Sequence, residues 1–138
     1  MNKIKKFNSS LEDLEHFNFF IEKFLKDNKC DTKLINKILT SCEEIFINIC
    51  KYAYNGNSGE IFLDVRLNMS KIIIEIQDSG IPFDPVSYVS KKANKTTKIG
   101  GLGIFLVKRL MDSVKYSRIN NKNVLTIIKK WKGDDENG

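Results

Sequence analysis

The sequence lacks several features that define common classes of protein. It has one histidine, two prolines and three cysteines among 138 residues. A histidine-rich zinc site is therefore excluded, and a Ser-His-Asp triad would have to use His16, which no supporting motif accompanies. No run of about eighteen apolar residues occurs, so we expect no membrane span.

The cysteines and the first residues both favour a reducing, cytoplasmic location. Cys30, Cys42 and Cys50 are odd in number and form no CxxC pair. We interpret them as small buried thiols, neither bridged nor metal-binding. Residues 1–6 (MNKIKK) are not followed by an apolar region or a small-residue cleavage site, so we expect no signal peptide.

The net charge of +6 arises from 23 basic and 17 acidic residues. The lysines are scattered through the chain and do not alternate with aromatic residues, as they often do in nucleic-acid binders, so we expect no nucleic acid as partner. The charge favours solubility and an attraction for anions. A nucleotide phosphate and an acidic protein would both qualify.

Residues 31–55 are predicted to form one long amphipathic helix, which Asp31 or Thr32 would cap. Its apolar face comprises Ile35, Ile38, Leu39, Cys42, Ile45, Phe46, Ile49 and Ala53. Glu44 and Asn48 stand four residues apart beside this face, hence one above the other. A ligand could contact both side chains, although a solvated glutamate and a tolerated asparagine are the ordinary alternative.

The remaining pattern predicts an α+β fold. We expect a strand at 3–8, a helix at 11–28 with a capping box of Ser9 and Glu12, strands at 60–67 and 71–77, and a hairpin of 114–119 and 124–130. A third helix, 104–113, carries the apolar residues Phe105, Leu106, Leu110 and Met111. Hairpins predominate over parallel crossovers, which predicts a two-layer α/β sandwich: a mixed, mostly antiparallel sheet with helices on one face. We expect a single domain over 1–132 and a disordered acidic tail over 133–138.

Two glycine motifs lie between the predicted strand at 71–77 and the closing hairpin. The first is DSGIPF at 78–83, in which Asp78 could accept a hydrogen bond from a base-edge amine while Gly80 lets the ring lie close. An ordinary Asp-initiated turn is the alternative. The second, GGLG at 100–103, precedes a helix, where Gly101 and Gly103 could bring backbone N–H groups to a phosphate. A plain loop-to-helix junction is the alternative here.

The second motif is neither a P-loop nor a dinucleotide fingerprint. GxxxxGK[ST] is absent, and a basic segment, not a strand, precedes the glycines. On the predicted central helix, Asn48 could hold a magnesium ion through its amide oxygen, because magnesium keeps waters and takes phosphate oxygens as further ligands. Glu44 could then polarise an attacking hydroxyl.

Taken in order, EIFIN at 44–48, DSGIPF at 78–83 and GGLG at 100–103 resemble the N, G1 and G2 boxes of the GHKL ATPase/kinase superfamily, and the resemblance spans nearly the whole chain. Within that superfamily, the small size, the form of the first glycine motif and the run GGLGIFLV resemble the bacterial anti-sigma-factor serine kinases of partner-switching systems. The resemblance implies a Bergerat-type ATP-binding fold.

The resemblance also implies roles for single residues. Asn48 would be the magnesium ligand, Glu44 the catalytic base and Asp78 the reader of the adenine amine. Gly80 would flank the base, and residues 87–98 would form a lid over ATP. The other ATP-binding residues would be Pro82, Phe83, Lys98, Gly100, Gly101, Leu102 and Gly103.

The implied reaction is transfer of the γ-phosphate of ATP, with Mg²⁺, to a serine or threonine of an anti-anti-sigma factor with a STAS domain. The kinase would also sequester a sigma factor and act as a homodimer. Some family members place an arginine just before the second glycine motif, whereas here the nearest base is Lys98. A nucleotide-gated protein-binding regulator without significant kinase activity therefore remains the alternative.

Overall fold

The computed structural model describes residues 2–87 and 101–131 of the chain. Their order is β1 (Asn2–Asn8), α1 (Leu11–Asp27), α2 (Thr32–Tyr52), β2 (Glu60–Leu67), β3 (Lys71–Asp78), α4 (Gly101–Leu110), β4 (Ser113–Ile119) and β5 (Lys122–Lys130). The predicted tail, 133–138, lies outside the described residues.

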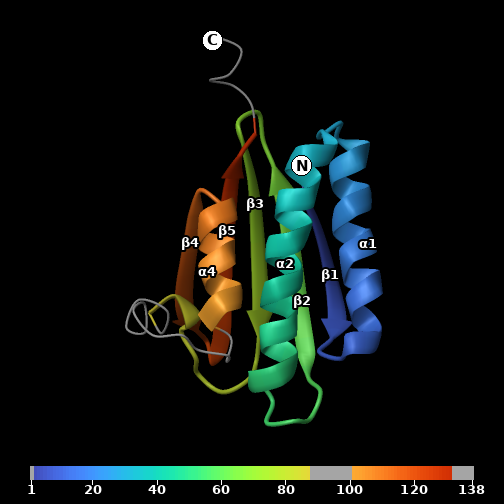
Figure 1. Cartoon of the computed structure of the whole chain (residues 1–138). Helices are drawn as coiled ribbons and strands as arrows, with labels where there is room; N and C mark the ends of the chain where they lie inside the picture. Colours follow the sequence, from blue (N-terminus) through green and yellow to red (C-terminus); the bar gives the residue numbers. More distant parts are fainter. Residues whose placement is uncertain (1, 88–100, 132–138) are drawn as a thin grey trace.

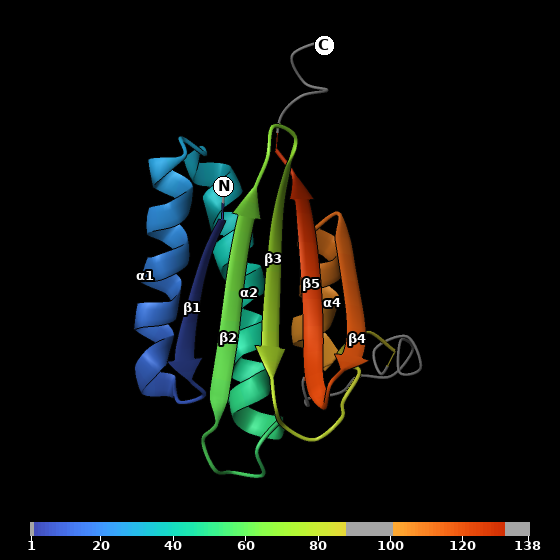
Figure 2. The same ribbon diagram turned by 180° about the vertical axis from the view of Figure 1, so that it is seen from behind.

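The five strands form one sheet in the order β1-β2-β3-β5-β4. Each neighbouring pair is antiparallel, so the α+β sandwich is confirmed, whereas no parallel pair is present among the described strands to make the sheet mixed. The three helices lie on one face of the sheet, and the view from behind shows the strands uncovered (Figures 1 and 2). The core fills the space between the two layers.

Helix α2 lies lengthwise over the middle of the sheet (Figure 1) and buries the predicted apolar face, except that Leu39 is half-buried. Asp31 caps it, since its Oδ1 accepts a 2.8 Å hydrogen bond from Leu34 N. The helix ends at Tyr52, three residues before the predicted end. Asn55 and Gly56 have φ angles of 52° and 84°, which a right-handed helix does not accommodate.

The predicted capping box at the start of α1 is wrong. Ser10, not Ser9, is the N-cap, and its side chain makes no cap hydrogen bond. Ser9 is buried, and its hydroxyl accepts from Gly59 N at 2.8 Å while Ser9 N donates to Gly59 O at 2.8 Å. The hydrogen bond from Gly59, just before β2, thus occupies the Ser9 hydroxyl that the predicted capping box would need.

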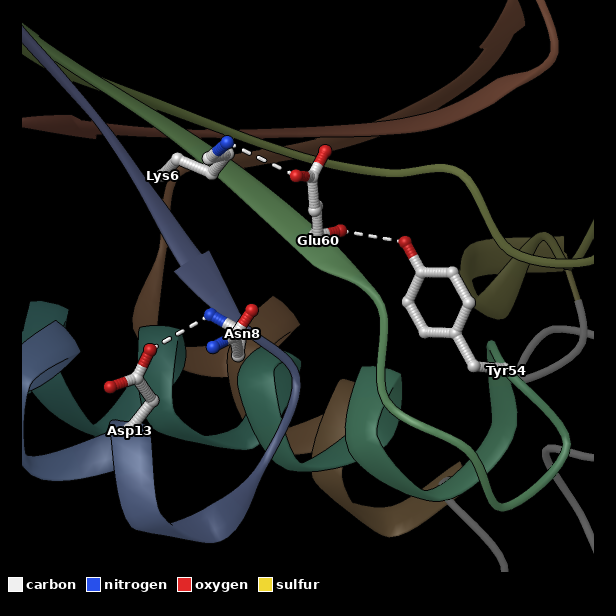
Figure 3. A network of polar contacts seen from close by, with 5 residues as sticks. All are labelled: Lys6, Asn8, Asp13, Tyr54 and Glu60. Atoms are coloured by element: carbon white, nitrogen blue, oxygen red, sulfur yellow. Dashed lines mark hydrogen bonds and ion pairs between the residues drawn. The ribbon is translucent and has the colours of Figure 1, made fainter.

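Polar contacts join β1, α1, β2 and the segment after α2 at this end of the sheet (Figure 3). Asn8 N donates to Asp13 at 2.8 Å, and Lys6 pairs with Glu60 at 3.1 Å. The Tyr54 hydroxyl donates to Glu60 O at 2.6 Å, which attaches the segment after α2 to the start of β2. These contacts fix where α2 ends relative to the strands.

Helix α4 also differs from its prediction. It begins at Gly101 and ends at Leu110, so the glycines at 101 and 103 lie inside its first turn and Ser113 already belongs to β4. Ile104 and Val107 are buried, whereas Phe105 and Leu106 are 45% and 37% exposed.

Cys30, Cys42 and Cys50 form no disulfide bond with one another, and Cys30 and Cys42 are buried. Burial raises the pKa of the Cys42 thiol far above its usual value and that of Cys50 to about 11. Both thiols therefore stay protonated at neutral pH. The predicted burial is confirmed for Cys30 and Cys42, whereas Cys50 is half-buried. In the part of the chain that the structure describes, no group of three or more His, Cys, Asp and Glu residues could hold a metal ion. No helix described there is both long and apolar enough to cross a bilayer.

Candidate functional site

The site is built on Asp78, the last residue of β3. In the ladders, Asp78 lies opposite Ile61 of β2 and Asn123 of β5, so two strands hold it from either side. Only 5% of the residue is exposed. Burial of an ionised carboxylate costs free energy unless hydrogen bonds or opposite charges compensate. For Asp78 these compensating groups come from the turn and the strands around it.

The turn after Asp78 packs against the end of α2. Gly80 N donates to Asp78 Oδ1 at 2.9 Å, and Ile81 N donates to Ala53 O at 2.9 Å. A Cβ atom on residue 80 would lie 2.2 Å from Ala53 O. Glycine is therefore required here by the close approach of the helix end, whereas the predicted role of Gly80, room for the ring of a ligand, stays a prediction.

Two residues that the sequence did not single out complete this cluster. Asn123 Nδ2 donates to Asp78 Oδ1 at 2.9 Å, and the Tyr116 hydroxyl donates to Asn123 Oδ1 at 2.5 Å. Both lie in the closing hairpin of β4 and β5, which the sheet places beside β3. No local motif marks them. The register between β3 and β5 brings Asn123 to Asp78, and Tyr116 joins the cluster through Asn123.

Electrostatics at Asp78 act in two directions. Desolvation by burial raises the pKa of this carboxyl, while hydrogen bonds from Asn123 and Gly80 and the positive charge of Arg118 lower it. Arg118 Nη1 also donates to Gly80 O at 2.9 Å, so the guanidinium is held beside the turn. Burial is the largest effect, and the pKa is raised.

An apolar pocket opens between α2, the end of β3 and α4. Asn48, Asp78, Phe83 and Asn123 line it together with Ile45, Ile49, Tyr52, Ala53, Ile76, Ile81, Pro85, Ile104, Tyr116 and Leu125. A mostly apolar cleft with a few polar groups suits a flat organic ring. Its free volume is about 40 Å³, and Ile81, which lines it, is exposed. Pro82 is exposed and does not line the pocket.

Glu44 and Asn48 lie one turn apart on α2, as predicted, and both are half-buried. Asn48 lines the pocket, and its buried Nδ2 has no hydrogen-bond partner among the described residues. A Cβ atom on Gly103 would lie 2.6 Å from Glu44 Oε1. The first turn of α4 therefore packs against the Glu44 carboxylate, and Glu44, Asn48 and Gly103 belong to one site.

The first turn of a helix carries N–H groups that have no acceptor within the helix. In α4 this turn begins with Gly101 and Leu102, so its N–H groups lie at the same end of the helix as Gly103 and Glu44. That arrangement favours an anion. Lys98, Gly100 and residues 88–98 of the predicted lid lie outside the described residues.

The chemistry at Asn48 fits a magnesium ion. The unpaired Nδ2 of Asn48 is an N–H donor, which suits an acceptor such as a phosphate oxygen and not a cation, so only Oδ1 of this amide could hold the ion. An amide oxygen is a suitable magnesium ligand, and the ion takes its remaining ligands from water and phosphate. Glu44, one helical turn away, adds negative charge that would favour a cation.

Comparison with known proteins agrees with this architecture. The family described as histidine kinase-like ATPase domain matches residues 7–129. In sequence, the chain is 32% identical over 111 residues to the serine-protein kinase RsbW of Oceanobacillus iheyensis, an alignment that covers 74% of this chain and 68% of that protein. It is 30% identical over 89 residues to RsbW of Listeria innocua, covering 59% of this chain and 57% of that protein. The chain thus spans less than two thirds of the Listeria relative.

Among solved structures, the RsbU and RsbW domains of Rv1364c from Mycobacterium tuberculosis superpose with a TM-score of 0.69. The match covers 96% of this chain and 33% of that chain, at 12% sequence identity. At this identity the likeness concerns the fold, which both chains share. With a family match over most of its length and a shared fold, this chain belongs to the histidine kinase-like ATPase domain family.

Proposed function

We propose that this protein is an ATP-dependent serine/threonine-protein kinase. The observation that carries the proposal is the convergence of Glu44, Asn48 and the first turn of α4 at one end of the pocket that contains Asp78. The names of the similar proteins, which are serine-protein kinases, support the same activity. The distribution of polar groups fits ATP, with its base beside Asp78 and its phosphates toward α4.

Each residue has a task in that reaction. Asp78 accepts a hydrogen bond from the exocyclic amine of adenine, and Gly80 and Phe83 flank the ring. Asn48 would hold a magnesium ion, which neutralises phosphate charge when bound. Glu44 takes the proton of the attacking hydroxyl, and Gly101, Leu102 and Gly103 supply N–H groups to the phosphates. By the resemblance, Pro82, Lys98 and Gly100 also contact ATP.

The substrate that the resemblance of the sequence motifs suggests is a serine or threonine of an anti-anti-sigma factor with a STAS domain. In such a system the kinase would also bind and sequester a sigma factor. The net charge of +6 suits acidic partners. The protein would act in the cytoplasm, and the proposed reaction needs no nucleic acid.

A homodimer is the assembly that we propose. The helices cover one face of the sheet, and no described element covers the other (Figure 2). That open face carries half-buried Ile73 and Ile128, which lie opposite each other in the ladder of β3 and β5. Analytical ultracentrifugation would give twice the monomer mass of 15.9 kDa for a dimer, and the monomer mass at every concentration would contradict it.

The kinase proposal is tested by substituting Glu44→Gln, which keeps the volume of the side chain and removes its basicity. We expect transfer of radiolabelled γ-phosphate to a small protein in a lysate of the source organism to fall at least a hundredfold, since general base catalysis contributes roughly 10²–10⁴. Binding of ATP should persist in the variant.

The matched control is Glu43→Gln, one residue away. Glu43 accepts a 3.1 Å hydrogen bond from Asn18 Nδ2, a contact that glutamine can keep. We expect transfer by this control to equal that of the native protein. Equal transfer by the Glu44 variant would contradict the role of base. ATP binding without transfer by the native protein would favour the nucleotide-gated regulator instead.

A further inference from the structure

Asn123 is a buried polar residue at the start of β5, with 7% of its surface exposed. It lies directly opposite Asp78 in the ladder between β3 and β5. A buried amide in a sheet must satisfy its own donors and acceptor. The hydrogen bonds that the Asn123 amide makes determine which oxygen of Asp78 is left for a ligand.

The amide of Asn123 uses all of its hydrogen-bonding capacity. Its Nδ2 donates to Asp78 Oδ1 at 2.9 Å and to Ile81 O at 2.8 Å. Its Oδ1 accepts from the Tyr116 hydroxyl at 2.5 Å and from Phe83 N at 3.2 Å. An amide has two N–H donors and two lone pairs on oxygen, so no capacity remains.

Two backbone groups fix the orientation of this amide. Ile81 O can only accept a hydrogen bond, and Phe83 N can only donate one. If the amide were rotated by 180°, its oxygen would meet the Ile81 carbonyl and its NH₂ group would meet the Phe83 N–H. The side chain therefore presents N–H, and not oxygen, to Asp78.

Asp78 is held through one oxygen only. Oδ1 accepts from both Gly80 N and Asn123 Nδ2, each at 2.9 Å. The contacts found for Asp78 among the described residues involve this oxygen, and the residue also lines the pocket. Oδ2 is thus the oxygen available to a ligand, and an ionised carboxylate oxygen can only accept a hydrogen bond.

We propose that Asn123 is the positioning residue for base selectivity, and that Tyr116 secures its amide so that Asp78 admits a 6-amino purine and rejects a 6-oxo purine. This inference rests on the proposed function, because it concerns the same ATP site. The amine of adenine would donate to Oδ2, whereas the carbonyl of hypoxanthine would set one acceptor against another. Two unpaired acceptors at a desolvated contact are unfavourable.

Loss of the Asn123 amide would change the protonation of Asp78 as well as its position. Burial raises the pKa of Asp78, and the Asn123 hydrogen bond, the Gly80 N–H and the charge of Arg118 oppose that rise. The other ionisable groups near this contact are Tyr54 and Tyr116, neutral at physiological pH, and Asp84, which lies beside Tyr116. Without Asn123, Asp78 binds its proton at higher pH and can donate to a 6-oxo group.

The test is calorimetric titration of the full chain with ATP and with inosine triphosphate, each with magnesium, in mildly acidic and mildly alkaline buffer. In the native protein we expect ATP to bind more tightly, by roughly tenfold or more. In Asn123→Ala the preference for ATP over inosine triphosphate should fall to about a tenth of its native value, and it should fall further in the acidic buffer. Tyr116→Phe, which keeps the ring, should lose a smaller part of the preference.

Asn36→Ala, at an exposed position of α2, is the matched control and should keep the native preference. A purely structural role for Asn123 would weaken both nucleotides equally at each pH, and that result would overturn the proposal. If Asn123→Ala does not fold, Tyr116→Phe decides: an unchanged preference overturns the proposal. A native protein that binds neither nucleotide refutes the proposed function, whereas one that binds both equally refutes this inference alone.

Discussion

At Asp78 the needs of ligand binding and of folding stability oppose each other. The proposed hydrogen bond to adenine requires an ionised acceptor in a pocket that excludes water. Burial raises the pKa of this carboxyl in the folded protein, so the folded state holds the proton more tightly than the unfolded chain does. Stability from this group is therefore present at low pH and is lost as pH rises through the folded pKa.

We predict that Asp78→Asn raises the free energy of unfolding at neutral pH and abolishes the preference for ATP. The neutral amide keeps an acceptor for Gly80 N and Asn123 Nδ2, and it removes the buried charge. The gain should shrink as pH falls through the raised pKa of the folded state, and it should be gone below the usual pKa of an aspartate, where the native carboxyl is protonated in both states. Urea denaturation across pH measures it.

Asp13→Asn serves as a comparison, because its effect on the free energy of unfolding should have the opposite sign. A hydrogen bond from Asn8 N is the largest cause that lowers the pKa of Asp13, so its ionised form stabilises the fold. That variant should be less stable than the native protein above the usual pKa of aspartate, and equally stable in acid. If Asp78→Asn were instead destabilised at neutral pH like Asp13→Asn, the account of a destabilising buried charge would be wrong.

Sequence reasoning identified some residues of the cluster and missed others for a physical reason. Asp78 and Gly80 stand in a short motif after a strand, so their neighbourhood is local. Asn123 is 45 residues from Asp78, and only the pairing of β3 with β5 joins them. Its hairpin shows nothing unusual in composition. Residues that depend on register cannot be recognised from spacing along one chain.

Among the elements, α2 was the most predictable and α4 the least. The helical period of α2 fixed its buried face and thereby placed Glu44 and Asn48 together. In α4 the consecutive residues Ile104, Phe105, Leu106 and Val107 are all apolar, so periodicity could not tell which of them face the core. Packing against α2 decides that Ile104 and Val107 are buried.

The contact between the turn at Gly80 and the last turn of α2 gives a prediction at the element scale. Gly80→Ala should lower the free energy of unfolding by about 3 kcal/mol, the upper part of the range for overpacking, because backbone of Ala53 must move. ATP affinity should fall as well, since the same turn carries Ile81 and Phe83, which contact Asn123. Urea denaturation and calorimetry measure the two effects.

Gly56→Ala is the control for that experiment. A Cβ atom there meets nothing within 4 Å, but φ is 84°, so the variant is strained by about 1 kcal/mol without touching the pocket. We expect its ATP affinity to remain native. Equal affinity losses in both variants, or none in Gly80→Ala, would show that the turn does not position the site.

At the scale of the whole molecule, the two-layer architecture followed from the order of strands and helices, whereas the strand order did not. Hairpins made β2 with β3 and β4 with β5 neighbours, as turn residues predicted. The pairing of β3 with β5, which creates the pocket, joins strands that α4 and β4 separate along the chain. No sequence pattern marks that pairing, so it could not be deduced from the pattern. Family resemblance supplied what periodicity could not.

The central claim is that ATP binds between α2, the end of β3 and the first turn of α4. The most direct test is to record amide NMR spectra of the isotopically labelled chain while magnesium and ATP are added. We predict that the largest shifts occur in the signals of Gly80 and Gly103 and in the side-chain amides of Asn48 and Asn123. Signals of β1, on the far edge of the sheet (Figure 2), should remain unchanged. An absence of shifts, or shifts centred on β1, would contradict the account.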